Sequence, residues 1–406
     1  MKKRLITLIL CSVIPVITFS QVVNNWRGTL RDGVYNEKEL LKTWPEGGPE
    51  MLWLYEGLGS GFTSPAIVDG KIYISGTTDD GTGYIHIIDL NGKLIKKIEY
   101  GPEFIVNYPG SRTSPLIDGN LAYMTSGHGV LYCVDLSAGK VKWKKDYFNE
   151  FDGKNLRFGF TEGLMIDGDK LYCTPGGPKY NIVALNKNTG DIIWVSEGKG
   201  TLSAYCSPLL FTHNGKRMLA TMMADYIVAV NPDNGKLLWS HPYKNDRNIH
   251  PNAPIYHDGN LYCFSGYGKG GVMVKINPDG NSVTETWATT AMDSQMGSVM
   301  LVNGKLYGSG DRNRKWFCLD WATGNTLGEL PFSELGKGNI IFSDGRLFAY
   351  TETGELAMAE PLDNGIKITG KVNITHGTEQ HWAHPVILNG VIYVRHGDAF
   401  MALKIK

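Results

Sequence analysis

Short runs of alternating apolar and polar residues recur along the chain, and many are interrupted by an Asp-Gly or Asn-Gly pair. Examples are residues 64–76 (SPAIVDGKIYISG) and 384–397 (HPVILNGVIYVRHG). A period of two predicts strands with one buried face. Asp-Gly and Asn-Gly are the strongest short hairpin signals, because a type I′ turn needs positive φ at both central positions. Each run therefore predicts a β-hairpin.

The hairpins repeat every 41–49 residues, in eight copies. Their turns are at Asp69-Gly70, Asp118-Gly119, Asp167-Gly168, Asn214-Gly215, Asp258-Gly259, Asn303-Gly304, Asp344-Gly345 and Asn389-Gly390. A second glycine turn follows seven of them, at Asn91-Gly92, Ala138-Gly139, Thr189-Gly190, Asn234-Gly235, Asp279-Gly280, Thr323-Gly324 and Asn364-Gly365. Each unit thus predicts four antiparallel strands, and a repeat of about 40–45 residues with that content is typical of a propeller blade.

The eighth unit lacks its second turn, because the chain ends at residues 400–406 (FMALKIK), which match a third strand. Residues 50–55 (EMLWLY) resemble the fourth strand at residues 236–243 (KLLWSHPY). The sequence therefore predicts an all-β fold, an eight-bladed β-propeller of four-stranded antiparallel blades, with the last blade closed by an N-terminal strand. Such a closure leaves no free seam. A solenoid is the alternative, but the split repeat favours a ring.

The first residues have the composition of a targeting segment. A basic start (MKKR) is followed by an apolar run, and Thr18-Phe19-Ser20 offers a cleavage site before Gln21. We predict a signal peptide over 1–20, a leader segment over 21–49 and the propeller over 50–406, in an exported protein, periplasmic or extracellular. A membrane anchor is the alternative, but the run is short for a span of about 20 residues. A lipoprotein signal at Cys11 is disfavoured by the preceding Leu10.

Charge and cysteine usage narrow the function classes. Without the residues of the basic start, 37 basic residues face 40 acidic ones, which gives no support for nucleic acid as a partner. The remaining cysteines are odd in number, form no C-x-x-C pair and mostly lie in apolar strand patterns. We interpret them as small buried hydrophobes rather than a disulfide or metal framework. They are Cys133, Cys173, Cys206, Cys263 and Cys318.

Residues 134–143 (VDLSAGKVKW), 184–194 (ALNKNTGDIIW) and 229–239 (AVNPDNGKLLW) follow the form A-x-D/N-x-x-T-G-x-x-x-W, with Ala or Asn in place of the Thr in two of them. This pattern resembles the repeat of the pyrroloquinoline-quinone-like eight-bladed propellers. The resemblance implies that the tryptophan docks against a turn of the neighbouring blade. Matching tryptophans are Trp53, Trp143, Trp194, Trp239 and, after a longer turn, Trp287; other blades have Lys96, Gly328 and Thr369 there.

The family includes quinoprotein dehydrogenases, the outer-membrane assembly lipoprotein BamB and secreted proteins without an assigned activity; the leader looks like that of the last group. A quinoprotein dehydrogenase would imply an adjacent cysteine pair, a calcium site and a catalytic aspartate. The chain has no Cys-Cys dipeptide, and no motif carries the acidic set. We therefore predict no cofactor, with pyrroloquinoline quinone and calcium disfavoured.

In a propeller, the loops that enter the innermost strands converge on one face, around the central channel. Here these loops carry cations, amides, histidines and aromatic rings, which suit an acidic or sugar-like ligand. The candidate ligand-binding residues are Arg112, Arg157, Glu162, Tyr205, His250, Asn252, Gln295, Lys337, Gln380, His381, Trp382 and His384. The alternative is a solvated channel mouth without a ligand.

Our leading functional hypothesis is a binding or scaffold protein that acts through this face on a protein, carbohydrate or acidic small-molecule partner. One alternative is a carbohydrate-active enzyme that uses His250, His381 or His384 as acid or base near a cation. A second is a quinone-dependent dehydrogenase. We predict no metal site, because His381 and His384, three residues apart in an extended loop, need not converge.

Overall fold

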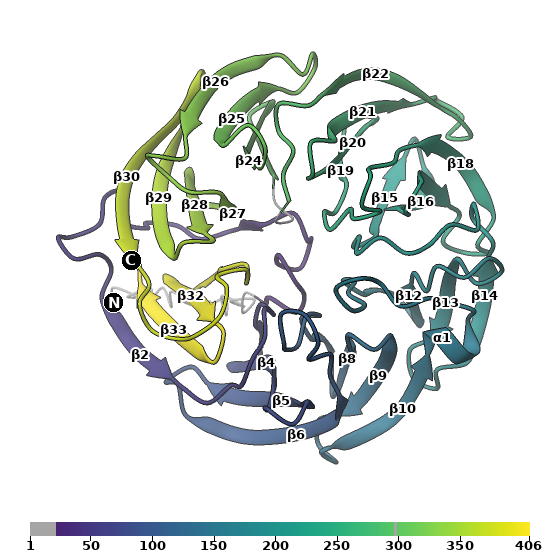
Figure 1. Cartoon of the computed structure of the whole chain (residues 1–406), viewed down its shortest axis with the longest axis horizontal. Helices are drawn as coiled ribbons and strands as arrows, with labels where there is room; N and C mark the ends of the chain where they lie inside the picture. The colour runs from purple at the N-terminus through teal and green to yellow at the C-terminus, as the bar shows by residue number, and fades with distance from the viewer. Residues whose placement is uncertain (1–21, 296–298) are drawn as a thin grey trace, which may run out of the picture.

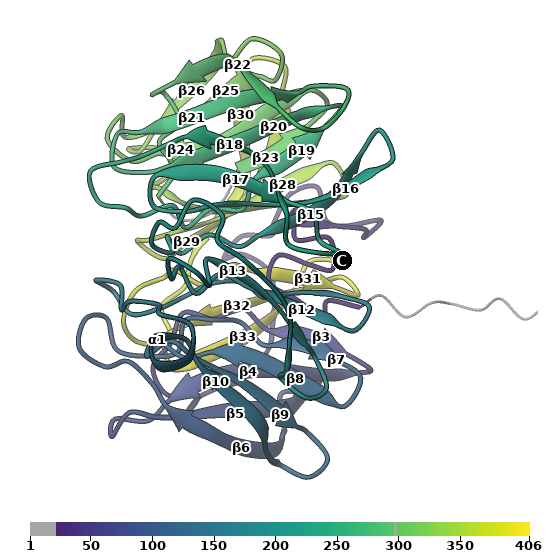
Figure 2. The ribbon, with the colours of Figure 1, turned by 90° about the vertical axis from the view of Figure 1, so that its right-hand side faces the viewer.

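The computed structural model describes residues 22–295 and 299–406. Eight antiparallel β-sheets stand around a central channel like the blades of a wheel (Figure 1), and the wheel seen from its side is a thick disc (Figure 2). The predicted eight-bladed propeller is confirmed. The predicted signal peptide lies outside the described residues. Within the part that is described, no helix is long and apolar enough to span a bilayer.

Each blade runs from a short innermost strand to a longer outer one. Blade 1 contains β3 (Ala66–Val68), β4 (Lys71–Thr77), β5 (Thr82–Asp89) and β6 (Leu94–Pro102), and blade 2 contains β7 (Leu116–Asp118), β8 (Leu121–Thr125), β9 (Val130–Asp135) and β10 (Lys140–Asp146). Blade 3 contains β11 (Met165–Asp167), β12 (Lys170–Cys173), β13 (Ile182–Asn186) and β14 (Ile192–Ser196). Blade 4 contains β15 (Leu209–His213), β16 (Lys216–Met222), β17 (Tyr226–Val230) and β18 (Leu237–Pro242). A one-turn helix, α1 (Tyr147–Glu150), follows blade 2.

The other four blades repeat this order. Blade 5 contains β19 (Ile255–His257), β20 (Asn260–Ser265), β21 (Gly270–Ile276) and β22 (Val283–Thr289); blade 6 contains β23 (Val299–Val302), β24 (Lys305–Gly310), β25 (Lys315–Asp320) and β26 (Thr326–Pro331); blade 7 contains β27 (Gly338–Ser343), β28 (Arg346–Thr351), β29 (Glu355–Leu362) and β30 (Gly365–Asn373); blade 8 contains β31 (Val386–Leu388), β32 (Val391–His396), β33 (Ala399–Lys404) and β2 (Met51–Tyr55). The alternating strand pattern buries one apolar stripe between each pair of neighbouring blades. Ile85 of blade 1, for example, shares a cluster with Val134 of blade 2.

The ring closes through blade 8, as the split repeat predicts. Strand β2 pairs antiparallel with β33, with Trp53 opposite Ala402 and Tyr55 opposite Phe400. Both ends of the chain thus contribute to one sheet (Figure 1).

The tight turns follow the sequence with one correction. Six of the eight have positive φ at both central residues, as Asp69 and Gly70 do at 50° and 70°, which a type I′ turn requires. In blade 2, Asp118 instead pairs with Leu121 in the sheet, and the turn shifts by one residue. Only Gly119 then has positive φ. Blade 3 shows the same shift.

The tryptophan docking implied by the family resemblance is present at four blade junctions. The Trp53 indole packs on Gly92, where a Cβ would come within 2.7 Å of the ring, and its Nε1 donates to the Leu90 carbonyl at 2.8 Å. Equivalent bonds run from an indole Nε1 to a backbone carbonyl of the next blade: Trp143 to Lys187, Trp194 to Pro232 and Trp287 to Trp321. At the blade 1 junction Lys96 takes the place of the tryptophan, and its Nζ donates to the Leu136 carbonyl at 2.9 Å.

Trp239 departs from this pattern. It is buried, but its Nε1 has no acceptor among the described residues, and the expected partner turn at Gly280 lies against Met218 and Lys216 instead.

The leader, residues 22–49, crosses the central channel, which the sequence did not predict. It appears as the purple trace through the middle of the ring (Figure 1). Val23 exchanges both backbone hydrogen bonds with Ile67 of blade 1. Strand β1 (Val34–Tyr35) then pairs parallel with β27, so that blade 7 has five strands. The leader therefore connects blades 1 and 7, which stand on either side of blade 8.

Two buried arginines of the leader hold it in the channel. Arg31 donates from Nη1 to the Pro208 carbonyl at 3.0 Å and from Nη2 to the Gly163 carbonyl at 2.7 Å. Arg27 donates to the carbonyl of Asp32, within the leader, at 2.9 Å and to the carbonyl of Ile340, in blade 7, at 3.4 Å. Burial lowers the pKa of each guanidinium to about 10, so both stay charged at neutral pH.

Candidate functional site

The loops that enter the innermost strands converge on one face, where they enclose a cavity of about 730 Å³. All eight loops contribute to its lining. Eight of the twelve candidate residues border it: Arg112, Glu162, Tyr205, Gln295, Lys337, Gln380, Trp382 and His384.

His250 and Asn252 lie elsewhere, although their loop does reach the cavity. Both are fully buried within the protein. His250 Nε2 donates to the Ala224 carbonyl at 3.2 Å, and Nδ1 faces the Ser265 hydroxyl at 3.0 Å. Burial lowers the pKa of His250 to about 4. This histidine is a neutral structural group, and its inward orientation could not be predicted from the repeat pattern.

His381 and Arg157 are also not part of the cavity lining. The His381 ring stacks on His396, with 3.5 Å between centroids, and its Nδ1 bonds the Tyr350 hydroxyl. Burial, with a smaller contribution from His396, lowers the pKa of His381 to about 4. Arg157 is exposed and lies over the Phe158 ring. Of the three histidines considered as acid or base, only His384 borders the cavity, and it is 5% exposed.

Aromatic rings line much of the cavity, more than the sequence predicted. The Tyr108 ring lies 4.7 Å from that of Trp382, and Phe62 lies 5.0 Å from Trp382 on another side. Phe158 continues this wall at 6.0 Å from Tyr108. Trp26, from the leader, also borders the cavity and makes an edge contact with His384. Tyr108, Phe158 and Trp382 lie in entry loops that the sequence already marked as carrying aromatic rings, but nothing in the repeat placed Trp26 here.

Arg112 stabilises the loop that carries Tyr108. Its Nη2 donates to the carbonyls of Asn107 and Tyr108 at 2.5 and 2.6 Å, and its guanidinium lies over the Phe104 ring. Burial lowers the pKa of Arg112 to about 10. Arg112 therefore places a positive charge at the cavity wall, and its hydrogen bonds hold the Tyr108 loop in position.

Lys337, predicted as a cation for the ligand, is already paired. Its Nζ lies 2.7 Å from Asp311 and 3.1 Å from Glu352, and it also donates to Gln295. The second oxygen of Glu352 accepts from Trp382 Nε1 at 3.0 Å. This network leaves one more negative than positive charge, and it fixes the orientation of the Trp382 indole.

Glu162 is at the cavity wall, but its carboxylate points into the blade. One oxygen accepts from the Tyr147 hydroxyl at 2.7 Å, and the other accepts from the backbone N–H and the hydroxyl of Thr174. Burial raises its pKa. The carboxylate is thus occupied by the fold.

The residues present do not fit a calcium-bound quinone. Among the described residues no group of three or more histidine, cysteine, aspartate or glutamate side chains gathers as a metal site. Calcium prefers six to eight oxygen ligands, whereas Glu162 and Glu352 are committed to protein donors. The five cysteines from Cys133 onwards are all buried and unpaired, as interpreted from the sequence.

Comparison with known proteins agrees with this architecture. A family model described as outer membrane protein assembly factor BamB matches residues 81–329, more than half of the chain. The chain belongs to the BamB family. Membership supports a binding or scaffold role in general.

Individual curated proteins and solved structures are also similar to this chain. Quinoprotein alcohol dehydrogenase PedH of Pseudomonas putida is 29% identical over 141 residues, 33% of this chain and 23% of that protein. The chain spans 23% of the length of each of the first two curated relatives it matches. BamB from Moraxella catarrhalis has a similar fold, with a TM-score of 0.61 and 13% identity over 88% of this chain and 99% of that one. Quinohemoprotein alcohol dehydrogenase from Comamonas testosteroni has a TM-score of 0.67 and 12% identity, over 95% of this chain and 80% of that one. At such identities the structures show the fold alone.

Proposed function

We propose that this protein is an exported binding protein that holds a hydroxyl-rich, sugar-like ligand, or the glycan of a larger partner, in the channel-face cavity. The observation that carries the proposal is the aromatic wall of Trp382, Tyr108, Phe62 and Phe158 beside polar groups in one cavity. Aromatic faces pack against the apolar faces of sugar rings, while amides and hydroxyls bond the sugar hydroxyls.

The charges favour a neutral ligand over an acidic one. Lys337 is compensated by Asp311 and Glu352. Arg112 is engaged with backbone carbonyls. Gln295 and Gln380, by contrast, border the cavity with side-chain amides that suit hydroxyl groups. The cavity volume of about 730 Å³ also lies in the usual range for ligand sites.

A glycan array with fluorescently labelled protein tests the ligand class. We expect retention on neutral glycans that is lost in Trp382→Ala and kept in Lys144→Ala, a change on the exposed outer strand β10. Retention confined to sulfated or uronic glycans would contradict the neutral class. No retention on any glycan would contradict the proposed function.

Export is part of the proposal and rests on the apolar N-terminal pattern. Expression in a Gram-negative host, followed by fractionation and N-terminal sequencing, tests it. We expect a periplasmic protein that begins at Gln21; an uncleaved cytoplasmic product would contradict export.

A further inference from the structure

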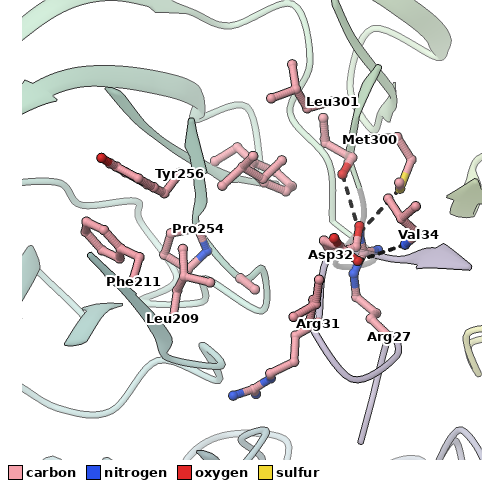
Figure 3. A pocket seen from close by; sticks show the side chains of 15 residues that line it. Arg27, Arg31, Asp32, Val34, Leu209, Phe211, Pro254, Tyr256, Met300 and Leu301 are labelled. Atoms are coloured by element: carbon pink, nitrogen blue, oxygen red, sulfur yellow. Dashed lines mark hydrogen bonds between the residues drawn. The ribbon is translucent and has the colours of Figure 1, made fainter. Parts of the chain in front are cut away.

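A second cavity, of about 260 Å³, lies between the leader and the innermost strands of blades 4, 5 and 6. Figure 3 shows Leu209, Phe211 and Tyr256 on one side of it, and Met300 and Leu301 on the other. Its lining residues differ from those of the channel-face cavity. This cavity, which we call the leader pocket, is therefore a separate candidate site.

The leader pocket exposes apolar side chains at positions that the innermost strands of blades 7 and 8 bury. The whole of β31 in blade 8 is buried, and so is most of β27, which pairs with the leader. In blades 4 and 5, Leu209, Phe211 and Ile255 on β15 and β19 remain partly exposed. The leader thus covers one side of the channel and leaves an apolar recess on the other.

The shape of the recess suits a ring. Phe211 and Tyr256 stack face to face, with 4.2 Å between their ring centroids, and form a packed aromatic pair at one side of the pocket. Leu30, in the turn of the leader between Arg27 and Gly33, is 73% exposed and also lines the pocket. An apolar cavity of about 150 Å³ is large enough to bind benzene. The leader pocket therefore has room for a benzene ring with a small substituent.

The charged donors around the pocket are engaged by the protein. Arg27 and Arg31 border it, and their guanidiniums donate to the backbone carbonyls of Asp32, Pro208 and Gly163. One Asp32 oxygen also accepts from the Val34 N–H at 2.9 Å. An ionised ligand would lose hydration in the pocket without gaining an unengaged charged partner.

We infer that the leader pocket is a binding site for a small uncharged aromatic ligand, whose ring packs against the stacked pair of Phe211 and Tyr256 and against Leu30. The ligand buries the apolar surface of blades 4 and 5 that the leader leaves open. The site is independent of the ligand proposed for the channel face.

Fluorine NMR on the full chain tests the inference, with para-fluorobenzyl alcohol as the probe. Para-fluorobenzoate and para-fluorobenzylamine carry the same ring with a negative or positive charge. We expect saturable broadening of the alcohol signal, and affinities for the two ions that are weaker by about tenfold, the factor that corresponds to 1.4 kcal/mol. No saturable signal from the alcohol, or an equal affinity for either ion, would overturn the inference.

Two variants locate the probe. Ala253→Leu fills the pocket from its wall and should weaken binding of the alcohol by about tenfold or more. Ala138→Leu, the same change on an exposed turn, should leave this binding unchanged. Leu209→Gln, at a partly exposed position, replaces Ala253→Leu as the test if that variant does not fold, with the same expected loss. Unchanged binding in the folded pocket variant, or binding lost in Trp382→Ala alone, would assign the probe to another site and overturn the inference.

Discussion

The indole Nε1 of Trp194 donates a 3.0 Å hydrogen bond to the carbonyl of Pro232 in the next blade. One blade further, Trp239 Nε1 has no acceptor among the described residues, although both rings are buried. The same motif position therefore makes two different contributions to the blade junctions. Both tryptophans stabilise their blade junction by packing, and Trp194 adds a hydrogen bond to it.

Replacing each tryptophan by phenylalanine separates these contributions. Trp194→Phe loses the hydrogen bond and leaves a carbonyl unpaired, so we expect a loss of about 1–2 kcal/mol of unfolding free energy beyond the loss of ring volume. Trp239→Phe removes an N–H that has no acceptor among the described residues, so its loss of unfolding free energy should be smaller. Urea unfolding of the two variants measures the difference. An equal or larger loss for Trp239→Phe would show that its N–H is bonded in solution.

Much of the fold could be predicted from local chemistry. The Asp-Gly and Asn-Gly turns need positive φ, so they marked eight hairpins, and the unit left incomplete at residues 400–406 indicated the closing strand. The shift at Asp118 could not be read, because Asp-Gly-Asn allows the two-residue turn to start at either of its first two residues. The path of the leader depends on Arg27 bonding to the Ile340 carbonyl and Arg31 to the Pro208 and Gly163 carbonyls, all far away in sequence, which no period reveals.

The candidate site was predictable in position but less so in orientation. Propeller topology brings the entry loops to one face, and eight of twelve candidates border the cavity. Whether a loop side chain points to the channel or into the blade depends on its tertiary partners. His250 finds Ser265 and Ala224, and Glu162 finds Thr174, so these polar groups turn inward. A role in ligand binding is therefore proposed only for those candidate residues whose polar groups face the cavity.

The leader should stabilise the ring through Arg31. Arg31→Leu removes a charged donor from the Gly163 and Pro208 carbonyls and should lower the unfolding free energy by about 2–4 kcal/mol. Arg157→Leu is the matched control at an exposed position, and its effect should stay within about 0.5 kcal/mol. Urea denaturation followed by circular dichroism measures both. If Arg31→Leu unfolded like the control, the leader would not occupy the channel in solution.

His250 predicts a pH dependence of stability. Its pKa is about 4 in the fold, below the value of 6.5 that it starts from. The unfolded chain therefore binds this proton at a higher pH than the folded one. The contribution of His250 is fully present above pH 6.5 and is lost as the pH falls towards 4, by about 3 kcal/mol at most.

The variant His250→Gln isolates this effect, because other groups titrate in the same range. Burial raises the pKa of Glu103 to about 6, and the stability that this group contributes is present at low pH and is lost as the pH rises through 6. Subtracting the unfolding free energies of the variant from those of the parent, between pH 7.5 and 4, removes the Glu103 contribution. A difference that does not shrink as the pH falls would contradict the neutral, buried His250.

Glu352 should act on the ligand site by orienting Trp382. Glu352→Gln keeps an acceptor for the indole N–H but weakens the ion pair with Lys337. We expect ligand affinity to fall by about threefold to tenfold, less than in Trp382→Ala, with tryptophan fluorescence shifted. The same substitution at the exposed Glu329 of β26 is the control. An affinity loss in Glu352→Gln as large as that in Trp382→Ala would assign Glu352 a direct contact with the ligand.

The proposed binding of a sugar-like ligand to the aromatic wall of the channel-face cavity can be measured directly. Isothermal titration calorimetry tests it with the neutral oligosaccharide that the array retains most strongly, on the parent, Trp382→Ala and Lys144→Ala. We expect affinity weakened by about tenfold or more in Trp382→Ala, at an unchanged melting temperature, and parental affinity in Lys144→Ala. Equal affinity in all three proteins would place the ligand away from the channel face and contradict the proposed function.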